Sequence, residues 1–314
     1  MTVCIAAISN NAHLFVASDR MRTSGDIQYE PEVPKIVELT TSIVMMTAGD
    51  SLLNREIIAH VKQTVDEAVD ANPETWLDVR QVVDWYVWYR QEIKRKAAEA
   101  AILVPLGMNS QTFLAQQDSL NSDLVQEIAR NLLHHPMPTV HVIIAGIDNN
   151  GPQIYSVRDG AVSYHNAVGF AAIGNGYWHV ESEFTSSGHH PGRSVPETAA
   201  LIYRAKRRAE TAPGVGRATD FAMILAKGEY QPVGDHIHSK LAELYDAMAA
   251  AEKEARNRVY LELDSYVAEL AIKRAQTQPT TQGVDGPDGS VDDANTRNAA
   301  PEAGPASTDN TSKS

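Results

Sequence analysis

The first fifty residues contain two pairs of short apolar runs, and a short turn separates the two runs of each pair. The runs are residues 2–9 (TVCIAAIS), 13–18 (HLFVAS), 35–39 (KIVEL) and 42–48 (SIVMMTA). Asn10-Asn11 lies in the first turn and Thr40-Thr41 in the second. Runs of this length and composition, separated by turn residues, are typical of β-strands joined as hairpins. The chain is therefore predicted to begin with two β-hairpins.

Helical and strand patterns then follow in blocks along the chain. Apolar residues at helical spacing predict helices over 51–69, 78–100 and 120–134, a helix after Gly176, and another over 194–210. Short apolar runs between turn residues predict strands at 139–147, 153–157, 161–165, 168–173, 221–228 and 230–233. Blocks of strands followed by blocks of helices indicate a layered α+β fold rather than a doubly wound one.

Two further segments follow this part of the chain. Apolar residues recur at three- and four-residue steps over 236–275, which predicts a helical extension, about 60 Å long if it is continuous. Its apolar stripe must be covered, so we expect it to be an interface element. Residues 276–314 are polar and nearly lack large apolar groups, so we expect a disordered tail. The expected domains are thus 2–235, 236–275 and 276–314.

Charge and composition exclude several classes of function. The net charge of −13 argues against a nucleic-acid partner and gives no reason to expect an anionic membrane surface. The single cysteine, Cys4, is expected in the core and permits no internal disulfide, which favours a reducing, cytoplasmic location. No apolar run is long enough to span a membrane. The histidine pairs lack a carboxylate at ligand spacing, so we expect no metal and no cofactor.

Thr2 is the first candidate for chemistry. It follows Met1 directly, and removal of Met1 would leave the Thr2 α-amino group beside its own hydroxyl, a pairing that activates a hydroxyl nucleophile. Such a site needs a nearby cation to disfavour the protonated amine, a carboxylate to hold that cation, and N–H groups for the oxyanion. Lys35, Asp19 and Gly49 supply these groups in the segments KIVEL, VASDR and TAGD. Taken singly, each also has an ordinary structural explanation.

Taken in order, these segments resemble a proteasome β-type subunit, and more closely the bacterial proteasome-like peptidases that include the Anbu group. The sixteen-residue step from Asp19 to Lys35 and the fourteen-residue step from Lys35 to Gly49 are similar to that family's pattern. Later segments also resemble it, over roughly residues 2–233: AGIDNNGPQIYSVRDGAV, AIGNGYWHVESEF, VPETAALIYRAKRRAE and TDFAMILAKG.

The resemblance implies a fold and a role for each residue. The implied fold is a four-layer αββα sandwich of the N-terminal-nucleophile hydrolase type, and the implied assembly is a ring or open stack of like subunits. Thr2 is implied as nucleophile and base, and Lys35 as the group that lowers the pKa of its amine. Asp19 is implied to hold Lys35, and the Gly49 N–H to contribute the oxyanion hole. The implied activity is hydrolysis of peptide bonds in peptides or unfolded proteins, with an unfoldase as a possible partner.

Two departures from the family pattern leave alternatives open. Asn175 stands where the family often has serine between two glycines, and an amide cannot relay a proton as a hydroxyl can. The late Asp-x-x-Ser pair of the family corresponds to Glu210 and Pro213, so Glu210 keeps the charge and Pro213 loses the hydroxyl. Asn175 and Glu210 are therefore expected as supporting residues. A catalytically silent ring-forming scaffold, or an amidase acting on small molecules by the same chemistry, remain as alternatives.

Overall fold

The computed structural model describes residues 2–24 and 27–277, which fall into two compact units. The first unit extends to Glu252 and the second begins at Lys253. The expected disordered segment 276–314 lies outside the described residues, except for Gln276 and Thr277, which end the last helix.

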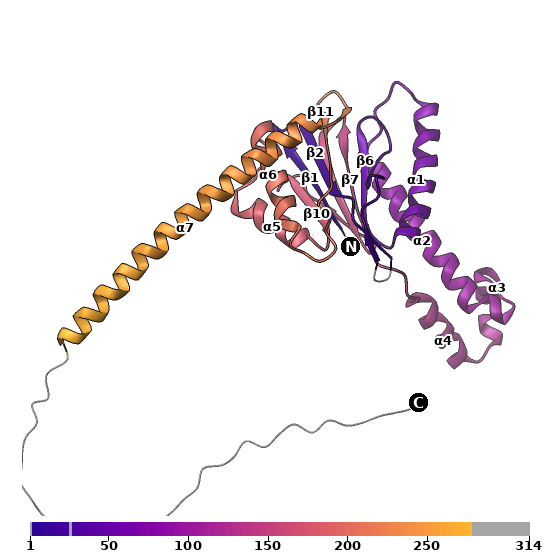
Figure 1. The fold of residues 1–314 in the computed structure, drawn as a ribbon. Helices are drawn as coiled ribbons and strands as arrows, with labels where there is room; N and C mark the ends of the chain where they lie inside the picture. The colour runs from indigo at the N-terminus through magenta and orange to yellow at the C-terminus, as the bar shows by residue number, and fades with distance from the viewer. Residues whose placement is uncertain (1, 25–26, 278–314) are drawn as a thin grey trace, which may run out of the picture. The chain divides into compact units, whose positions relative to one another are not determined.

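The described residues form twelve β-strands and seven α-helices (Figure 1). The strands are β1 Val3–Ser9, β2 His13–Asp19, β3 Arg22–Ser24, β4 Ile27–Tyr29, β5 Ile36–Glu38, β6 Ile43–Gly49, β7 Val140–Asp148, β8 Gly151–Arg158, β9 Ala161–Tyr164, β10 Phe170–Gly174, β11 Thr219–Leu225 and β12 Glu229–Pro232. The helices are α1 Ser51–Ala71, α2 Val79–Ile102, α3 Ser110–Gln116, α4 Ser122–Leu133, α5 Tyr177–Ser186, α6 Val195–Ala209 and α7 Asp235–Thr277.

Two five-stranded antiparallel sheets organise the first unit. The first sheet has the order β10-β1-β2-β11-β12, and the second has the order β5-β6-β7-β8-β9. Both predicted hairpins are confirmed, because β1 pairs with β2 and β5 pairs with β6. Asn10 and Asn11 both adopt positive φ, at 51° and 54°, which is the conformation that asparagine tolerates in a tight turn.

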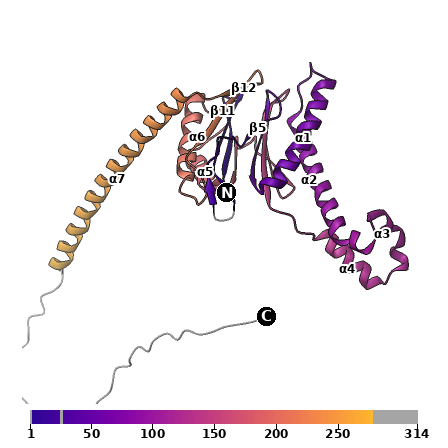
Figure 2. The same cartoon turned by 45° about the vertical axis from the view of Figure 1, so that its right-hand side comes forward.

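The two sheets pack face to face between two layers of helices (Figure 2). Side chains alternate along β1, so Cys4, Ala6 and Ile8 lie in the core between the sheets. Val3, Ile5 and Ala7 point the other way and pack against α5 and α6. The outer face of the second sheet packs against α1 and α2. The chain is thus a mixed α+β protein, as predicted.

The remaining differences from the sequence prediction are local. The segment expected as a strand over 221–228 forms β11 two residues earlier, and Gly228, at φ 76°, turns the chain into β12. The short strands β3 and β4 and the helix α3 had no clear sequence signal, because three-residue strands and seven-residue helices are too short to show a period. Helices α3 and α4 pack beside the end of α2 through Leu103, Phe113 and Ile128.

Helix α7 is continuous and belongs to both units. Its first turns pack on α6: Leu241 is buried there, the Tyr245 ring lies 6.1 Å from that of Tyr203, and Arg207 lies over Tyr245. These contacts explain why the first unit extends beyond residue 235, the expected boundary. The apolar residues of its second part are exposed, including Val259 and Leu263. Among the described residues, no helix combines the length and apolarity needed to cross a bilayer.

Candidate active site

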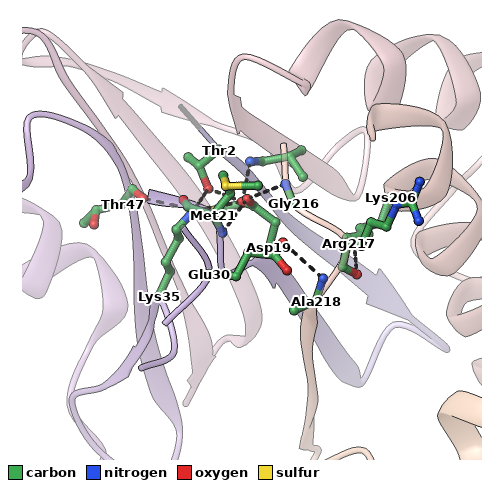
Figure 3. Close-up of polar contacts among 12 residues, drawn as sticks. Thr2, Asp19, Met21, Glu30, Lys35, Thr47, Lys206, Gly216, Arg217 and Ala218 are labelled. Atoms are coloured by element: carbon green, nitrogen blue, oxygen red, sulfur yellow. Dashed lines mark hydrogen bonds and ion pairs between the residues drawn. The ribbon is translucent and has the colours of Figure 1, made fainter. Parts of the chain in front are cut away.

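Thr2, Asp19 and Lys35 converge at one end of the two sheets (Figure 3). Thr2 directly precedes β1 and Asp19 ends β2, so the antiparallel pairing of Cys4 with Ser18 brings the two residues together. Lys35 directly precedes β5 in the other sheet and reaches across to them. The structure therefore assembles the three residues that the sequence analysis singled out.

Asp19 is the centre of this cluster and is fully buried. Its Oδ1 accepts hydrogen bonds from the Thr2 hydroxyl, from the Val3 N–H at 2.9 Å and from the Lys35 ammonium at 2.9 Å. Its Oδ2 accepts from the N–H groups of Met21 and Gly216, each at 2.9 Å. A buried carboxylate needs such donors, because an unpaired charge in the interior costs several kcal/mol. The network holds the Asp19 side chain in one orientation.

Lys35 connects the carboxylate to the hydroxyl. Its Nζ donates to Thr2 Oγ1 at 2.5 Å and also to the Met21 carbonyl, while it forms a buried ion pair with Asp19. The Thr2 hydroxyl therefore donates to a carboxylate and accepts from an ammonium. Charge-assisted contacts of this kind orient the oxygen and favour loss of its proton during an attack.

A second ion pair, between Lys206 and Glu210, lies close to this cluster. Lys206 on α6 is fully buried, and its Nζ donates to Glu210 Oε1 at 2.7 Å and to the Arg217 carbonyl at 2.6 Å. The neighbouring Gly216 N–H is a donor to Asp19. Burial lowers the pKa of Lys206, and the contact with Glu210 opposes that shift. Among the described residues, Glu210 contacts Lys206 and Arg207 rather than Thr2, and it acts on the cluster indirectly, through Lys206 and the Arg217 loop.

Gly49 and Asn175 both lie beside Thr2, on the wall of a cavity of about 410 Å³. Gly49 has φ 100°, and a Cβ there would lie 2.2 Å from the Thr139 carbonyl oxygen. Gly174 has φ 90°, and a Cβ there would lie 2.2 Å from the Thr2 carbonyl oxygen. Both positions require glycine, because a side chain would collide with backbone that cannot move away. Gly174 thus allows the chain to approach Thr2 closely, and Gly49 allows β6 to approach the Thr139 backbone.

The same cavity contains residues that the sequence analysis missed: His141, Arg158, Tyr177 and Trp178. They come from β7, β8 and α5, and no spacing along the chain connects them. Their common position follows from sheet register, because Ala48 pairs with His141 and His141 pairs with Arg158. Burial lowers the pKa of His141 below its usual value, against the opposing effect of Asp159, and so favours the neutral ring.

Cys4 lies in β1 close to this cluster, and burial raises the pKa of its thiol from 9.0 to about 12. At pH 8 the folded protein then holds about one thiolate in 10⁴ molecules, so we expect iodoacetamide not to modify it. Unfolding in urea should expose the thiol and give one alkylation by mass. In the unfolded chain the Cys4 thiol has a pKa near 9.0. Burial of the neutral thiol therefore stabilises the fold fully below pH 9.0, and this stabilisation is lost as the pH rises from 9.0 to about 12. Rapid alkylation of the native protein at pH 8 would contradict this prediction.

No group of three or more histidine, cysteine, aspartate or glutamate side chains among the described residues is placed to hold a metal ion. No family model matches the chain, and no curated protein matches it.

Proposed function

We propose that this protein is a threonine-type hydrolase that cleaves peptide bonds with Thr2 as its nucleophile, after removal of Met1. The observation that carries the proposal is the convergence of Thr2, Lys35 and Asp19 beside a cavity that also contains Gly49. Three residues distant in sequence are held within hydrogen-bond distance of one another at the point where a substrate has room to bind. The fold is then of the N-terminal-nucleophile hydrolase type.

The proposed reaction has two steps. In the first, Thr2 Oγ1 attacks the carbonyl carbon of the substrate while the free Thr2 amine takes the hydroxyl proton. The oxyanion is stabilised by the Gly49 N–H, and the C–N bond then breaks as the proton passes from the Thr2 amine to the leaving nitrogen. In the second, water hydrolyses the Thr2 ester, releasing the acid and restoring the hydroxyl.

Each supporting residue has a distinct role in this proposal. The Lys35 ammonium contacts Thr2 Oγ1 and disfavours the protonated amine beside it. Asp19 holds Lys35 in place and is itself held by backbone N–H groups. Asn175, on the cavity wall, offers an amide to the amine or to the attacking water. We also propose that the subunits form a homo-oligomeric ring or stack in the cytoplasm and take peptides or unfolded proteins as substrates.

The proposal is tested by the intact mass of the purified protein before and after treatment with a peptide epoxyketone. This reagent needs both the free amine and the hydroxyl of Thr2, so we expect loss of Met1 followed by a single adduct. The adduct should be mapped to the N-terminal peptide by fragmentation. A folded protein that retains Met1, or that is trimmed but forms no adduct, would refute the hydrolase and favour a scaffold subunit.

A further inference from the structure

The cavity beside Thr2 lies at the open end of the space between the two sheets. Along β6 and β7 the side chains of Met46 and Ile143 fill the core between the sheets. Two residues further along each strand, Ala48 and His141 point to the same side, and Arg158 of β8 is paired with His141. The side chains of Ala48, His141 and Arg158 thus form one row across the sheet. The row runs from the residue next to Gly49 to the Arg158 guanidinium.

Arg158 is anchored but keeps unused hydrogen-bond donors. Its Nη2 donates to the Ala172 carbonyl at 3.1 Å, and its guanidinium lies 4.6 Å from the centre of the Tyr177 ring. The same Nη2 forms a longer ion pair with Glu181 Oε1 at 3.8 Å, beyond hydrogen-bond distance, and both side chains of this pair are 39 % exposed. Within the described residues the guanidinium makes no other hydrogen bond, although it carries five N–H donors.

The wall of this cavity has a positive charge and no acidic residue. It is lined by Thr2, Ala48, Gly49, Thr139, His141, Arg158, Gly174, Asn175, Tyr177 and Trp178. Arg158 is always charged, while burial lowers the pKa of His141 and favours its neutral ring. The protein as a whole carries a net charge of −13, so its overall electrostatic field repels anions. Arg158 is a local positive charge that opposes this repulsion. Across more than about 8 Å that field is largely screened by physiological salt, whereas a partly buried contact inside a cavity is screened less.

We propose that this cavity binds a carboxylate of the substrate, and that Arg158 makes the enzyme selective for peptides with an acidic residue close to the scissile bond. This inference rests on the proposed function, because selectivity for a scissile bond applies only if the protein cleaves peptides. Two strand spacings of about 4.8 Å place the Arg158 backbone about 10 Å from that of Ala48. A peptide advances about 3.5 Å per residue, so the acidic side chain belongs within about three residues of the cleaved bond. The rings of Tyr177 and Trp178 offer contact area for its apolar part.

The test measures binding to the full-length Thr2→Ala variant, which does not depend on catalysis. The probes are acetylated, amidated peptides of five alanines in which one position in turn carries glutamate, with a matched set carrying glutamine. Isothermal titration calorimetry should show that, for at least one position, the glutamate peptide binds about tenfold more tightly than its glutamine partner. The ratio should fall when salt is raised, because the contact is between charges.

Substitution at Arg158 identifies the residue responsible. Arg158→Gln, made in the Thr2→Ala background, should reduce the ratio to about one, and Arg158→Lys should keep part of it. Arg80→Gln is the matched control, because Arg80 also lies over a tyrosine ring and beside an acid, on α2. It should leave the ratio unchanged. If Arg158 only supports Ala172 and Tyr177, Arg158→Gln will lower the melting temperature and leave the ratio intact. If that variant does not fold, the wild-type ratio and Arg158→Lys decide.

Several outcomes would overturn the inference: equal affinities for every glutamate and glutamine pair, no binding of any peptide at millimolar concentration, or a ratio that survives Arg158→Gln. Labelling of unsubstituted protein by an epoxyketone separates this result from the proposed function. Epoxyketone labelling without a preference for glutamate in the binding assay would support the proposed hydrolase and refute the acidic selectivity. Binding that prefers glutamate, without epoxyketone labelling, would support the acidic selectivity and refute the proposed hydrolase.

Discussion

Replacement of Thr2 by alanine is expected to abolish epoxyketone labelling and to reduce peptide hydrolysis by on the order of 10³-fold or more. The side chain carries the oxygen that we propose attacks the substrate, and in the described part of the chain no other hydroxyl contacts both Asp19 and Lys35. The fold should persist, because Lys35 and Asp19 remain paired with each other at 2.9 Å without the hydroxyl. Labelling by mass and hydrolysis of a fluorogenic peptide measure the two effects.

Thr2→Ser is the matched control for this variant. Serine keeps the hydroxyl that contacts Asp19 and Lys35, so it should retain labelling and a substantial share of the activity. Loss of the methyl group alone should affect mainly the position of the side chain beside Gly174, where Thr2 Cγ2 packs closely. Hydrolysis that survives Thr2→Ala at the wild-type rate would show that another residue is the nucleophile.

Replacement of Asp19 by asparagine should cause the largest loss of stability among substitutions in the cluster, on the order of 3–5 kcal/mol. Asparagine keeps the shape of the side chain but presents an NH₂ group where one carboxylate oxygen accepts hydrogen bonds. If that group replaces Oδ2, the N–H groups of Met21 and Gly216 lose their acceptor. Lys35, whose side chain is only 10 % exposed, loses the charge that compensates its burial. Activity should fall with the displacement of Lys35.

Urea unfolding followed by tryptophan fluorescence would measure this change, since the chain has four tryptophans. Asp220→Asn is a suitable control, because Asp220 lies on the adjacent strand β11, opposite Ser18, and pairs with Arg20. Arg20 is 34 % exposed and is screened by water, so this control should cost about 1 kcal/mol. Equal losses of unfolding free energy in the Asp19→Asn and Asp220→Asn variants would contradict the central role of Asp19.

Much of the fold follows from local patterns in the sequence. The two opening hairpins, the helices α1, α2 and α6, and the strands β7 and β8 were predicted close to their observed bounds. These elements have strong periodicity and clear end signals, such as the Asn10-Asn11 turn and the Ser194–Glu197 capping box. The short strands β3 and β4 and helix α3 lack such signals, so only packing against their neighbours defines them.

The candidate site divides in the same way. Thr2 and Asp19 were predictable as neighbours, because a hairpin with a short turn places the start of one strand beside the end of the next. Glu210 was expected to support the site, but its role through Lys206 and the Arg217 carbonyl depends on the fold of α6 and the loop after it. The i, i+4 spacing of Lys206 and Glu210 is compatible with an ion pair, but it fits an exposed helix face equally well and indicates neither the burial of Lys206 nor its contact with the Arg217 carbonyl.

What the sequence by itself determined is the order of elements, the mixed α+β class and the short-range pairing of Thr2 with Asp19. Only the tertiary structure decided that Lys35 reaches them from the second sheet, and that Arg158 and His141 lie on the wall of the same cavity. The physical reason is that sheet register and sheet packing bring together residues that lie far apart in the sequence. Hydrophobic periodicity records which face of a strand is buried, but not which strand lies opposite it.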